Sequence, residues 1–466
     1  MRKVSRKRNL FYFSIFLGFI VLFWTLTRHH SIQFQDSSNK TIEQNPQSYS
    51  NQLLSNVSPE QFGADGFDDK LDTKALQAAI NKSSKVTLKN GATYIIDKPL
   101  TCNHAITIVS EDESKSPAVI LQKNKTSAFI FENKPVNTTN VIEKMSKNDR
   151  YVVLENTKGM KQGGLLHLKS DKLWYWDNRD YLTKGGLYKI TKIRNQKVYL
   201  DRDLSESYDI GINENVTVDA YANHEINLKG ISFTHPLPYD SKMVVIHFSS
   251  NATISDVSIS NSKLTGIFLN KTFATTIQDV NINLGVTKKT KLGYGIQDYG
   301  GSGTIIQNSI FKNVRRGVDF SGDTPSRYGI VSDSKVFGAK KGSLAPGNSG
   351  FGTHSTAEHI LFKNNYVVNF NQAFLVRGNE ITIKNNIHTG KSNYFLSLGY
   401  GNHVTLQNNI YKSTTNDSLK SFVLIQNSYF GSLIAEGNRS GDNPTFIGGN
   451  LKHLEKLALQ KKISIN

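Results

Sequence analysis

The chain has 466 residues, of which 38% are hydrophobic, so it is long enough for a large buried core and too apolar for a disordered protein. Its one cysteine, Cys102, excludes an intramolecular disulfide framework and a cysteine-based zinc cluster. The 56 Lys and Arg residues exceed the 38 Asp and Glu residues and give a formal net charge of +18. The cations are spread along the chain rather than gathered in a tail, so we expect no nucleic-acid partner.

The first residues have the pattern of a membrane anchor. Residues 2–8 carry five cations, and residues 10–27 form an apolar run whose only ionisable residue is Tyr12. A helix of that length is just long enough to cross the hydrocarbon core. No small-residue cleavage site follows the run, so an uncleaved signal anchor is favoured over a signal peptide.

The flanking charges predict the orientation of this anchor. Because the cations precede the apolar run, residues 1–9 are expected to be a cytoplasmic tail, residues 10–27 a single span of the cell membrane, and the rest extracytoplasmic. Residues 28–58 are rich in Ser, Asn and Gln, which is typical of a flexible tether. Without residues 1–8, 51 cations still face 38 anions. That excess favours an acidic polysaccharide as partner, with a solvated lysine surface as the alternative.

A family resemblance starts at Gln61. The segment QFGADGFDD is followed by an Ala/Gln-rich helix over residues 72–80 and by strands within VTLKNGATYII. Asp72 is placed to cap that helix, whose Leu76 and Ile80 share one face. This order resembles the start of the right-handed parallel β-helix proteins of the pectin-lyase-like superfamily. The resemblance implies an all-β, single-stranded parallel β-helix with an N-terminal cap helix over residues 59–466, and a carbohydrate substrate.

Internal repeats support the same fold. Seven β-type runs each end in a polar turn pair, at Asp256, Asp279, Asn308, Asp333, Asn364, Asn385 and Asn408. The steps of 23, 29, 25, 31, 21 and 23 residues match one coil of a parallel β-helix, with two coils enlarged by loops near 284–294 and 338–349. Stacked asparagines can hydrogen-bond along such a ladder, so the Asn pairs are interpreted as structural rather than catalytic.

Two other segments differ from the coils. Residues 150–220 alternate between apolar and polar residues with Gly, Asp and Asn turns, which predicts a small antiparallel β insertion. Its Trp174-Tyr175-Trp176 either stacks on sugar rings or packs in a small core. Residues 451–466 carry leucines among lysines and are expected to cap the open end of the solenoid.

Four coils begin a strand with a similar phrase, which allows their side chains to be aligned. The small residue and the apolar residue after it place Ile296, Val318, Phe351 and Phe374 inward. Alternation then makes the outward pairs Gln297 and Tyr299, Asp319 and Ser321, Gly352 and His354, and Leu375 and Arg377. At about 4.8 Å per coil, one outer face gathers Tyr299, Asp319, His354 and Arg377 within roughly 15 Å.

These residue types suit removal of the C5 proton of a uronate. His354 would be the base, Tyr299 the acid, and Asp319 would orient the imidazole, while Arg377 or the pair Arg315-Arg316 would hold the carboxylate. The predicted catalytic residues are His354, Tyr299, Asp319 and Arg377, and the predicted substrate-binding residues are Arg315, Arg316, Gln297, Asp323 and His388. The segment Ser349–Ser355 resembles the YGFDPHD signature of mannuronan C5-epimerases, with Gly352 and Ser355 in place of its two acids.

The leading hypothesis is therefore a monomeric, membrane-anchored lyase or epimerase that acts on an acidic polysaccharide. A glycoside hydrolase would need two carboxylates, for which Asp298, Asp319 and Asp323 are candidates, although alternation turns Asp298 inward. A non-catalytic polysaccharide-binding or surface-assembly protein is the other alternative. No cofactor or metal is predicted; Asp65, Asp68 and Asp69 are interpreted as turn and cap residues, with calcium ligation as the alternative.

Overall fold

The computed structural model describes residues 53–112, 114–174, 182–211, 213–286, 293–338, 347–414, 420–441 and 445–465. The predicted tail, the membrane span and most of the tether lie outside these ranges. Within them, no helix is both long enough and apolar enough to cross a membrane. The chain joins the folded domain before Pro59, because Leu54 and Val57 form parallel bridges with Ser83 and Val86.

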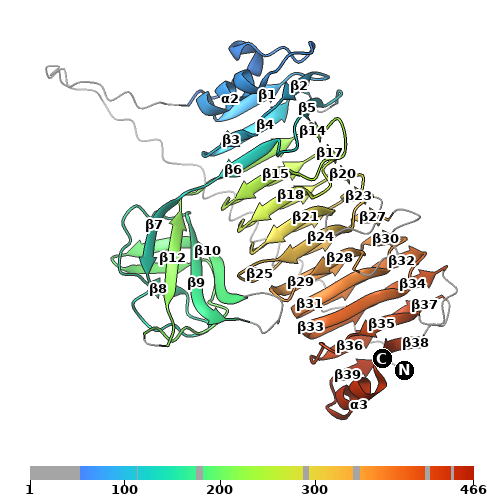
Figure 1. Ribbon diagram of the computed structural model, residues 1–466. Helices are drawn as coiled ribbons and strands as arrows, with labels where there is room; N and C mark the ends of the chain where they lie inside the picture. The colour runs from blue at the N-terminus through green and yellow to red at the C-terminus, as the bar shows by residue number, and fades with distance from the viewer. Residues whose placement is uncertain are drawn as a thin grey trace, which may run out of the picture. The chain divides into compact units, whose positions relative to one another are not determined.

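The domain is a solenoid of parallel strands, which confirms the predicted all-β parallel β-helix (Figure 1). Three parallel ladders run along it. The first ladder contains β3 (Leu100–Cys102), β6 (Phe129–Glu132), β15 (Lys242–His247), β18 (Thr265–Asn270), β21 (Tyr294–Tyr299), β24 (Arg316–Ser321), β28 (Ser349–Thr353), the first halves of β31 (Gln372–Lys384) and β33 (Tyr394–Gln407), β35 (Ser421–Ile425) and β38 (Thr445–Gly449).

The second ladder follows the first around each coil and merges with it where β31 and β33 run through the corner. It contains β1 (Lys85–Leu88), β4 (Ile106–Ser110), β13 (Ile226–Lys229), β16 (Thr253–Ser255), β19 (Thr276–Gln278), β22 (Ile305–Gln307), β26 (Ile330–Ser332), β29 (Ala357–Lys363), the second halves of β31 and β33, β36 (Leu433–Glu436) and β39 (Ile463–Ile465). The short strand β25 (Ser326–Arg327) pairs with the start of β29.

The third ladder closes the coil. It contains β2 (Thr93–Ile96), β5 (Ala118–Gln122), β14 (Ile231–Thr234), β17 (Ser258–Ser260), β20 (Asn281–Asn283), β23 (Ile310–Lys312), β27 (Lys335–Phe337), β30 (Tyr366–Val368), β32 (Ile387–Gly390), β34 (Ile410–Ser413) and β37 (Arg439–Ser440).

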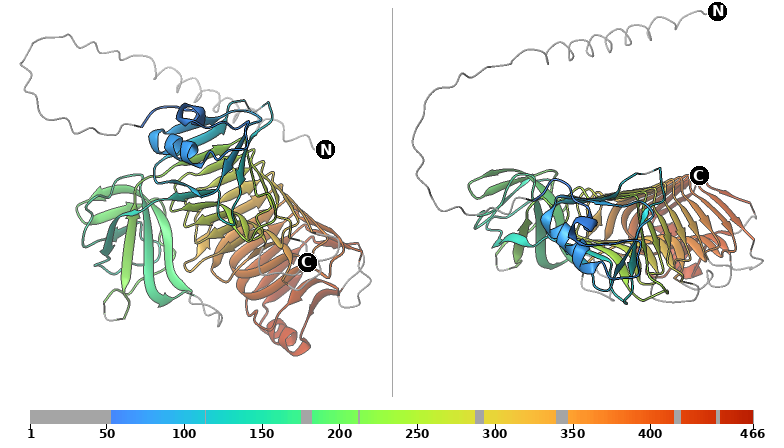
Figure 2. Two further views of the ribbon diagram at one scale, coloured as in Figure 1. Left: turned by 45° about the horizontal axis from the view of Figure 1, so that its top comes forward. Right: turned by 90° about the horizontal axis from the view of Figure 1, so that it is seen from above.

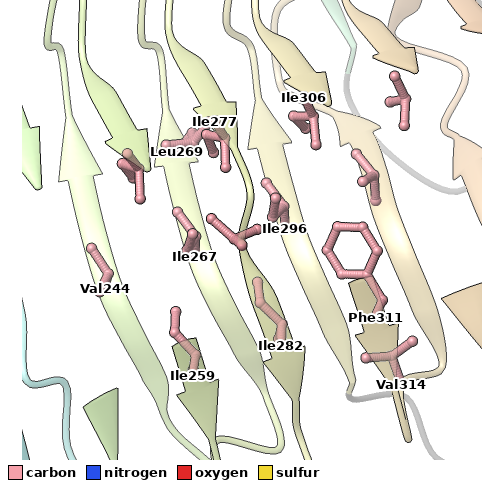
Figure 3. Packing of buried hydrophobic residues seen from close by; sticks show 14 of the residues in the cluster. Val244, Ile259, Ile267, Leu269, Ile277, Ile282, Ile296, Ile306, Phe311 and Val314 are labelled. Atoms are coloured by element: carbon pink, nitrogen blue, oxygen red, sulfur yellow. The ribbon is translucent and has the colours of Figure 1, made fainter. Parts of the chain in front are cut away.

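The core lies inside the coils, where apolar side chains of the three ladders meet. Ile267, Ile296 and Val318 are stacked in register and fully buried, and Figure 3 shows the first two beside Ile277 and Ile282 of the other ladders. Toward the C-terminus the same column becomes aromatic, with ring centroids 5.9 Å apart for Phe351 and Phe374. Burial of this continuous apolar column is what stabilises coils that could not bury a core singly.

The repeated turn residues hold a left-handed backbone conformation. All seven predicted positions, from Asp256 to Asn408, have φ between 50° and 57°. Asn and Asp tolerate this region better than other non-glycine residues, and glycine occupies the corresponding place at Gly437 with φ 62°. Each turn therefore redirects the chain from the second ladder to the third at the same point in the coil.

Both ends of the solenoid are covered. The N-terminal end carries a 3-10 turn, η1 (Pro59–Phe62), and α2 (Thr73–Lys82), which buries Leu76 and Ile80 as predicted. Asp72 stands at the N-cap but bonds elsewhere: its carboxylate accepts the backbone N–H groups of Asp65 and Ile95, each at 3.0 Å. At the other end, α3 (Leu451–Leu459) buries Leu457, and β39 extends the second ladder.

The predicted insertion is an antiparallel sheet that starts earlier than residue 150. Its strands are β7 (Pro135–Asn140), β8 (Tyr151–Val153), β9 (Leu165–Leu173), β10 (Thr183–Arg194), β11 (Lys197–Leu200) and β12 (Val216–Tyr221). The sheet leaves the solenoid after β6, has its own buried cluster, and stands beside the coils (Figure 2).

A buried arginine joins the insertion to the solenoid. Arg327 of β25 donates to Glu206 of the insertion and to Glu358 of β29, and its Nη1 lies 2.7 Å from the Gly185 carbonyl. The indole of Trp174 donates to Glu206 at 2.8 Å and lies against the Arg327 guanidinium. Trp174 therefore serves this interface, while Tyr175 and Trp176 lie outside the described residues.

A stack of four asparagine side chains, three of them buried, supports the structural interpretation of the Asn pairs. Asn365, Asn386, Asn409 and Asn438 are linked by side-chain hydrogen bonds of 2.9 to 3.1 Å. The Asn386 amide also donates to the Phe362 and Lys384 carbonyls, and its oxygen accepts the Asn365 backbone N–H. The second residue of each pair therefore satisfies backbone groups inside the turn.

We expect Asn386→Ala to lower the free energy of unfolding by about 3 kcal/mol, because it leaves several buried polar groups unpaired. Urea unfolding followed by circular dichroism measures this loss. The control is Asn385→Gly, since Asn385 is exposed with φ 57° and glycine adopts that conformation without strain. Equal losses in the two variants would contradict the assignment.

Candidate functional site

The first ladder has the register predicted from the repeated phrase. Ile296, Val318, Phe351 and Phe374 are successive partners and all point inward. Gln297, Asp319, Gly352 and Leu375 form one outward row, and Tyr299 and Ser321 belong to a second outward row. His354 continues that second row, because its backbone N–H donates to the Phe320 carbonyl at 2.7 Å. The predicted outer face therefore exists.

Asp319 is the centre of this face. Its carboxylate is fully buried, and Oδ1 accepts a short hydrogen bond from Nη1 of Arg316 on the same strand. Oδ2 faces Nε2 of His354 at 3.5 Å. The guanidinium is itself fixed by a 3.0 Å hydrogen bond from Nε to the Ser349 hydroxyl. One carboxylate thus connects a buried cation to the imidazole of the following coil.

Gly352 makes room for this arrangement. A Cβ at this position would stand 2.9 Å from both Cζ and Nε of Arg316 and 2.7 Å from the Leu375 carbonyl oxygen. The space that an acidic side chain would need at position 352 is therefore filled by the Arg316 guanidinium. Because Asp319 is the register partner of Gly352, a carboxylate still lies beside the histidine.

Arg316 is not available to a substrate, contrary to the prediction. Its side chain is 2% exposed, and its charge is matched by Asp319. Arg316 is instead a positioning residue that fixes the Asp319 carboxylate. His354 has 32% of its side-chain surface exposed, so it is the member of the group that a ligand reaches.

The other predicted cations lie around this centre. Arg315 is half-buried, and its Nη1 donates to the Tyr294 hydroxyl at 2.8 Å. Arg377 is also half-buried, and its backbone N–H donates to the Thr353 hydroxyl at 3.0 Å, which places it next to His354 in the following coil. Gln297 lies one coil from Asp319 and donates to the Ser321 hydroxyl at 3.4 Å.

Tyr299 lies on the N-terminal side of the centre. Its strand, β21, is two coils from β28, and Ser321 stands between Tyr299 and His354 in the same row. The ammonium of Lys271 is 5.1 Å from the Tyr299 ring centroid and 2.8 Å from Asp323 Oδ1. Burial by itself would raise the pKa of Asp323, but the charge and hydrogen bond of Lys271 together with the Thr324 backbone N–H lower this pKa overall, so the carboxyl is held ionised.

Two of the predicted residues, His388 and Asp298, point into the interior of the coils. His388 is fully buried on β32 and stacked on Tyr411, with ring centroids 5.6 Å apart, so the prediction that it binds substrate is wrong. Asp298 is inward, as alternation indicated, and is enclosed by hydrogen bonds from Gly301, Thr304 and Ser326.

The insertion borders the site at the C-terminal edge of the strands. The Thr183 backbone N–H donates to the Asp323 carbonyl at 2.9 Å, so the start of β10 touches the corner that follows Ser321. Most of the two enlarged loops predicted to flank this face, near 284–294 and 338–349, lies outside the described residues. Across the described ranges, no cluster of His, Cys, Asp and Glu is arranged to hold a metal ion.

Several residues of this face were missed by the sequence analysis. Phe268 on β18 is the outward register partner of Gln297, and the ammonium of Lys242 on β15 lies over its ring. The Tyr294 hydroxyl on β21 accepts from Arg315, and Lys271 follows β18. Extending the strand alignment by one coil toward the N-terminus predicts the outward direction of Phe268. Alternation does not predict Lys242 and Tyr294, because each stands two residues before an inward side chain, Val244 and Ile296 respectively.

We expect Arg316→Met to lower the free energy of unfolding by about 3 to 5 kcal/mol, because it leaves the Asp319 carboxylate buried without its cation. The double variant Arg316→Met/Asp319→Asn should be more stable than Arg316→Met alone, since it removes the uncompensated charge. Urea unfolding of the two single variants and the double variant measures the coupling. Strictly additive losses would show that the two side chains do not act as a pair.

The buried imidazole of His388 predicts an acid-dependent loss of stability. Burial lowers the pKa of His388 to about 3 from the ordinary 6.5, so below pH 6.5 the unfolded chain binds a proton that the native protein does not. The contribution of the neutral His388 imidazole to the free energy of unfolding is complete above pH 6.5 and declines as the pH falls. We expect His388→Phe to reduce the slope of stability against pH between about pH 6 and 4. His167, whose pKa burial also lowers to about 3, should retain part of the slope. An unchanged slope in His388→Phe would contradict this account.

Comparison with known proteins identifies the architecture. No family model and no curated protein sequence matches the chain. Among solved structures, it is similar to the tailspike protein gp49 from Pseudomonas phage LKA1 at 13% identity, over 84% of this chain and 77% of that one, with a TM-score of 0.65. The gp54 tailspike of Acinetobacter baumannii bacteriophage AP22 is 14% identical over 85% and 70%, with a TM-score of 0.58.

A third similar structure is the A-module of mannuronan C-5 epimerase AlgE4 from Azotobacter vinelandii. It is 11% identical over 84% of this chain and 91% of that module, with a TM-score of 0.51. Identities this low establish the fold alone. Together with the stacked coils and their asparagine turns, they show that the chain has the fold of the pectate-lyase-like parallel β-helix proteins.

Proposed function

We propose that this protein is a lyase or C5-epimerase that acts on an acidic polysaccharide at the outer face of β21, β24, β28 and β31. The observation that carries the proposal is the contact of 3.5 Å between Nε2 of His354 and the buried Asp319 carboxylate. Arg316 fixes the orientation of this carboxylate by donating to its other oxygen. An imidazole oriented in this way at an accessible surface is suited to proton transfer.

His354 is the proposed base. A carboxylate facing Nε2 favours the tautomer with the proton on that nitrogen, so Nδ1 carries the lone pair. Nδ1 would accept the proton from C5 of a uronate, and the electron pair left on carbon would be delocalised into the sugar carboxylate. That anion needs a cation beside it, and Arg377, one coil further along, is the proposed partner.

Tyr299 is the proposed acid. It stands in the same row as His354 with Ser321 between them, so a sugar ring over Ser321 would be flanked by the two groups. In a lyase the C4–O bond breaks, a C4–C5 double bond forms, and the phenol protonates the leaving oxygen. In an epimerase the phenol returns a proton to C5 from the opposite side. Both reactions use the same first step.

The geometry disfavours a glycoside hydrolase. That reaction requires one protonated and one ionised carboxyl on either side of the glycosidic bond. Asp298 points into the core, and Asp319 is buried against Arg316. Asp323 is accessible but ionised, because its pairing with Lys271 lowers its pKa despite burial. None of the three predicted candidates suits the role of general acid.

The comparisons supply supporting context. One similar structure is named as a mannuronan C-5 epimerase, and another is a tailspike in complex with capsular saccharide. The excess of cations after residue 8 favours an acidic glycan as the ligand. We further propose that residues 10–27 anchor the protein in the cell membrane, with the solenoid on the extracytoplasmic side.

The test is incubation of the purified full-length protein with alginate, polygalacturonate and hyaluronan. We expect one of them to yield an unsaturated uronate, detected by its absorbance, or to exchange its C5 proton with deuterated water, detected by NMR. His354→Ala should reduce that rate by about 10² to 10⁴, the usual contribution of a general base.

The matched control is His403→Asn, because His403 is an exposed histidine at a corner of the solenoid, 3.3 Å from Glu380. This variant should keep the full rate. Full activity in His354→Ala would exclude the proposed site. New reducing ends without an unsaturated product would indicate hydrolysis instead, and retention of an unaltered polymer would indicate a binding protein.

A further inference from the structure

Lys242 is a cation of the outer face that lies well away from His354. It opens β15, and its ammonium stands 3.2 Å from the ring centroid of Phe268 on the next coil. Phe268 is 9% exposed, so its ring is a platform under the ammonium rather than a surface for sugar. The His247 ring, at the other end of β15, packs edge-on against the same phenylalanine. The lysine is therefore held on the floor of the face.

This ammonium has no carboxylate partner within the part of the chain that the structure describes. Two buried cations near this face do have one: Arg316 pairs with Asp319, and Lys271 pairs with Asp323. The register partner of His247 in the preceding coil is Glu132, which makes no salt bridge with Lys242. Lys242 is half-buried, and this burial lowers the pKa of its ammonium. A cation in that position is stabilised when a ligand supplies the anion.

The position of Lys242 relative to His354 defines the ligand. The strands β15, β18, β21, β24 and β28 are successive neighbours, so four steps of about 4.8 Å separate the two coils by roughly 19 Å. The surface between them carries Gln297, Tyr299 and Ser321 from the two outward rows. This surface presents hydrogen-bonding groups and one aromatic ring to a ligand that lies along the solenoid axis.

We propose that Lys242 is an anion subsite that binds the carboxylate of a sugar several residues away from the one at His354. The proposal rests on the proposed function and narrows its substrate class to a polymer with repeated carboxylates, bound along the solenoid axis. A disaccharide occupying the His354 site would not reach Lys242. We therefore expect the contribution of Lys242 to binding affinity to appear with the polymer and not with the disaccharide.

The experiment compares Lys242→Met with the parent protein, because methionine keeps an apolar stem over Phe268 and removes the charge. Binding is measured by isothermal titration in the His354→Ala background, with polygalacturonate and alginate as probes, each also as its disaccharide. For whichever polymer binds, we expect Lys242→Met to lower the affinity about three- to tenfold, which is the effect of losing one partly desolvated ion pair. Disaccharide affinity should not change, and the salt dependence of polymer binding should become weaker.

Two variants serve as controls. Lys242→Arg retains the charge and should restore most of the polymer affinity. Lys335→Met removes an exposed lysine of β27 on the third ladder and should have no effect. If Lys242→Met binds polymer as tightly as the parent, or loses the disaccharide equally, the subsite proposal is wrong.

The binding titrations, taken together with the activity assay of the proposed function, separate the two proposals. Polymer binding that depends on Lys242 without any chemical change in the glycan would overturn the catalytic proposal and leave the subsite in place. Catalysis that depends on His354 but not on Lys242, for polymer and disaccharide alike, would overturn the subsite and leave the catalytic proposal in place. Absence of polymer binding in every variant would overturn the subsite.

Discussion

Hydrogen bonding between successive coils is the constraint on which the rest of this structure depends. Each strand of the first ladder pairs in parallel with the next, and a slip by one residue would turn every inward side chain outward. The left-handed turn residues, such as Asp279 and Asn308, begin the third ladder at the same point in each coil. Apolar stacking inside the coils then favours a single register, as in the column of Ile296, Val318 and Phe351. Loops of different length between the strands leave that register intact.

Because the register is fixed, residues far apart in the sequence act as one group. Asp319 and His354 come from adjacent coils separated by an enlarged loop, yet their side chains face each other. The absence of a side chain at Gly352 is as important as the acid, since it lets the Arg316 guanidinium lie across the strand. In a solenoid the chemistry of a position is therefore decided by its neighbours in the coils on either side, as well as by its own strand.

This explains which parts of the structure could be predicted from the sequence. The repeated phrase and the alternation along a strand are local, so they predicted the fold, the outward direction of His354 and the inward direction of Asp298. The burial of Arg316 depends on Gly352 and Ser349 in the next coil, and alternation alone gives no information on contacts across a ladder. The prediction for His388 is wrong because this residue follows a turn pair on β32, in the third ladder, and the repeated phrase of the first ladder does not indicate which residues of the third point inward. Its burial against Tyr411 belongs to that third ladder.

The charges of the solenoid can now be divided by what they contact. Arg316, Lys271 and Arg327 each have a carboxylate partner, so the cations that the fold buries most deeply add little to the long-range field. The positive excess of the sequence must then reside mainly in exposed lysines, which attract any polyanion and discriminate poorly among them. Selectivity requires a cation that is both fixed in place and without a partner from its own chain. Among the described residues of the first ladder's outer face Lys242 meets both conditions, and it does so in the same column of coils that positions Asp319 and His354.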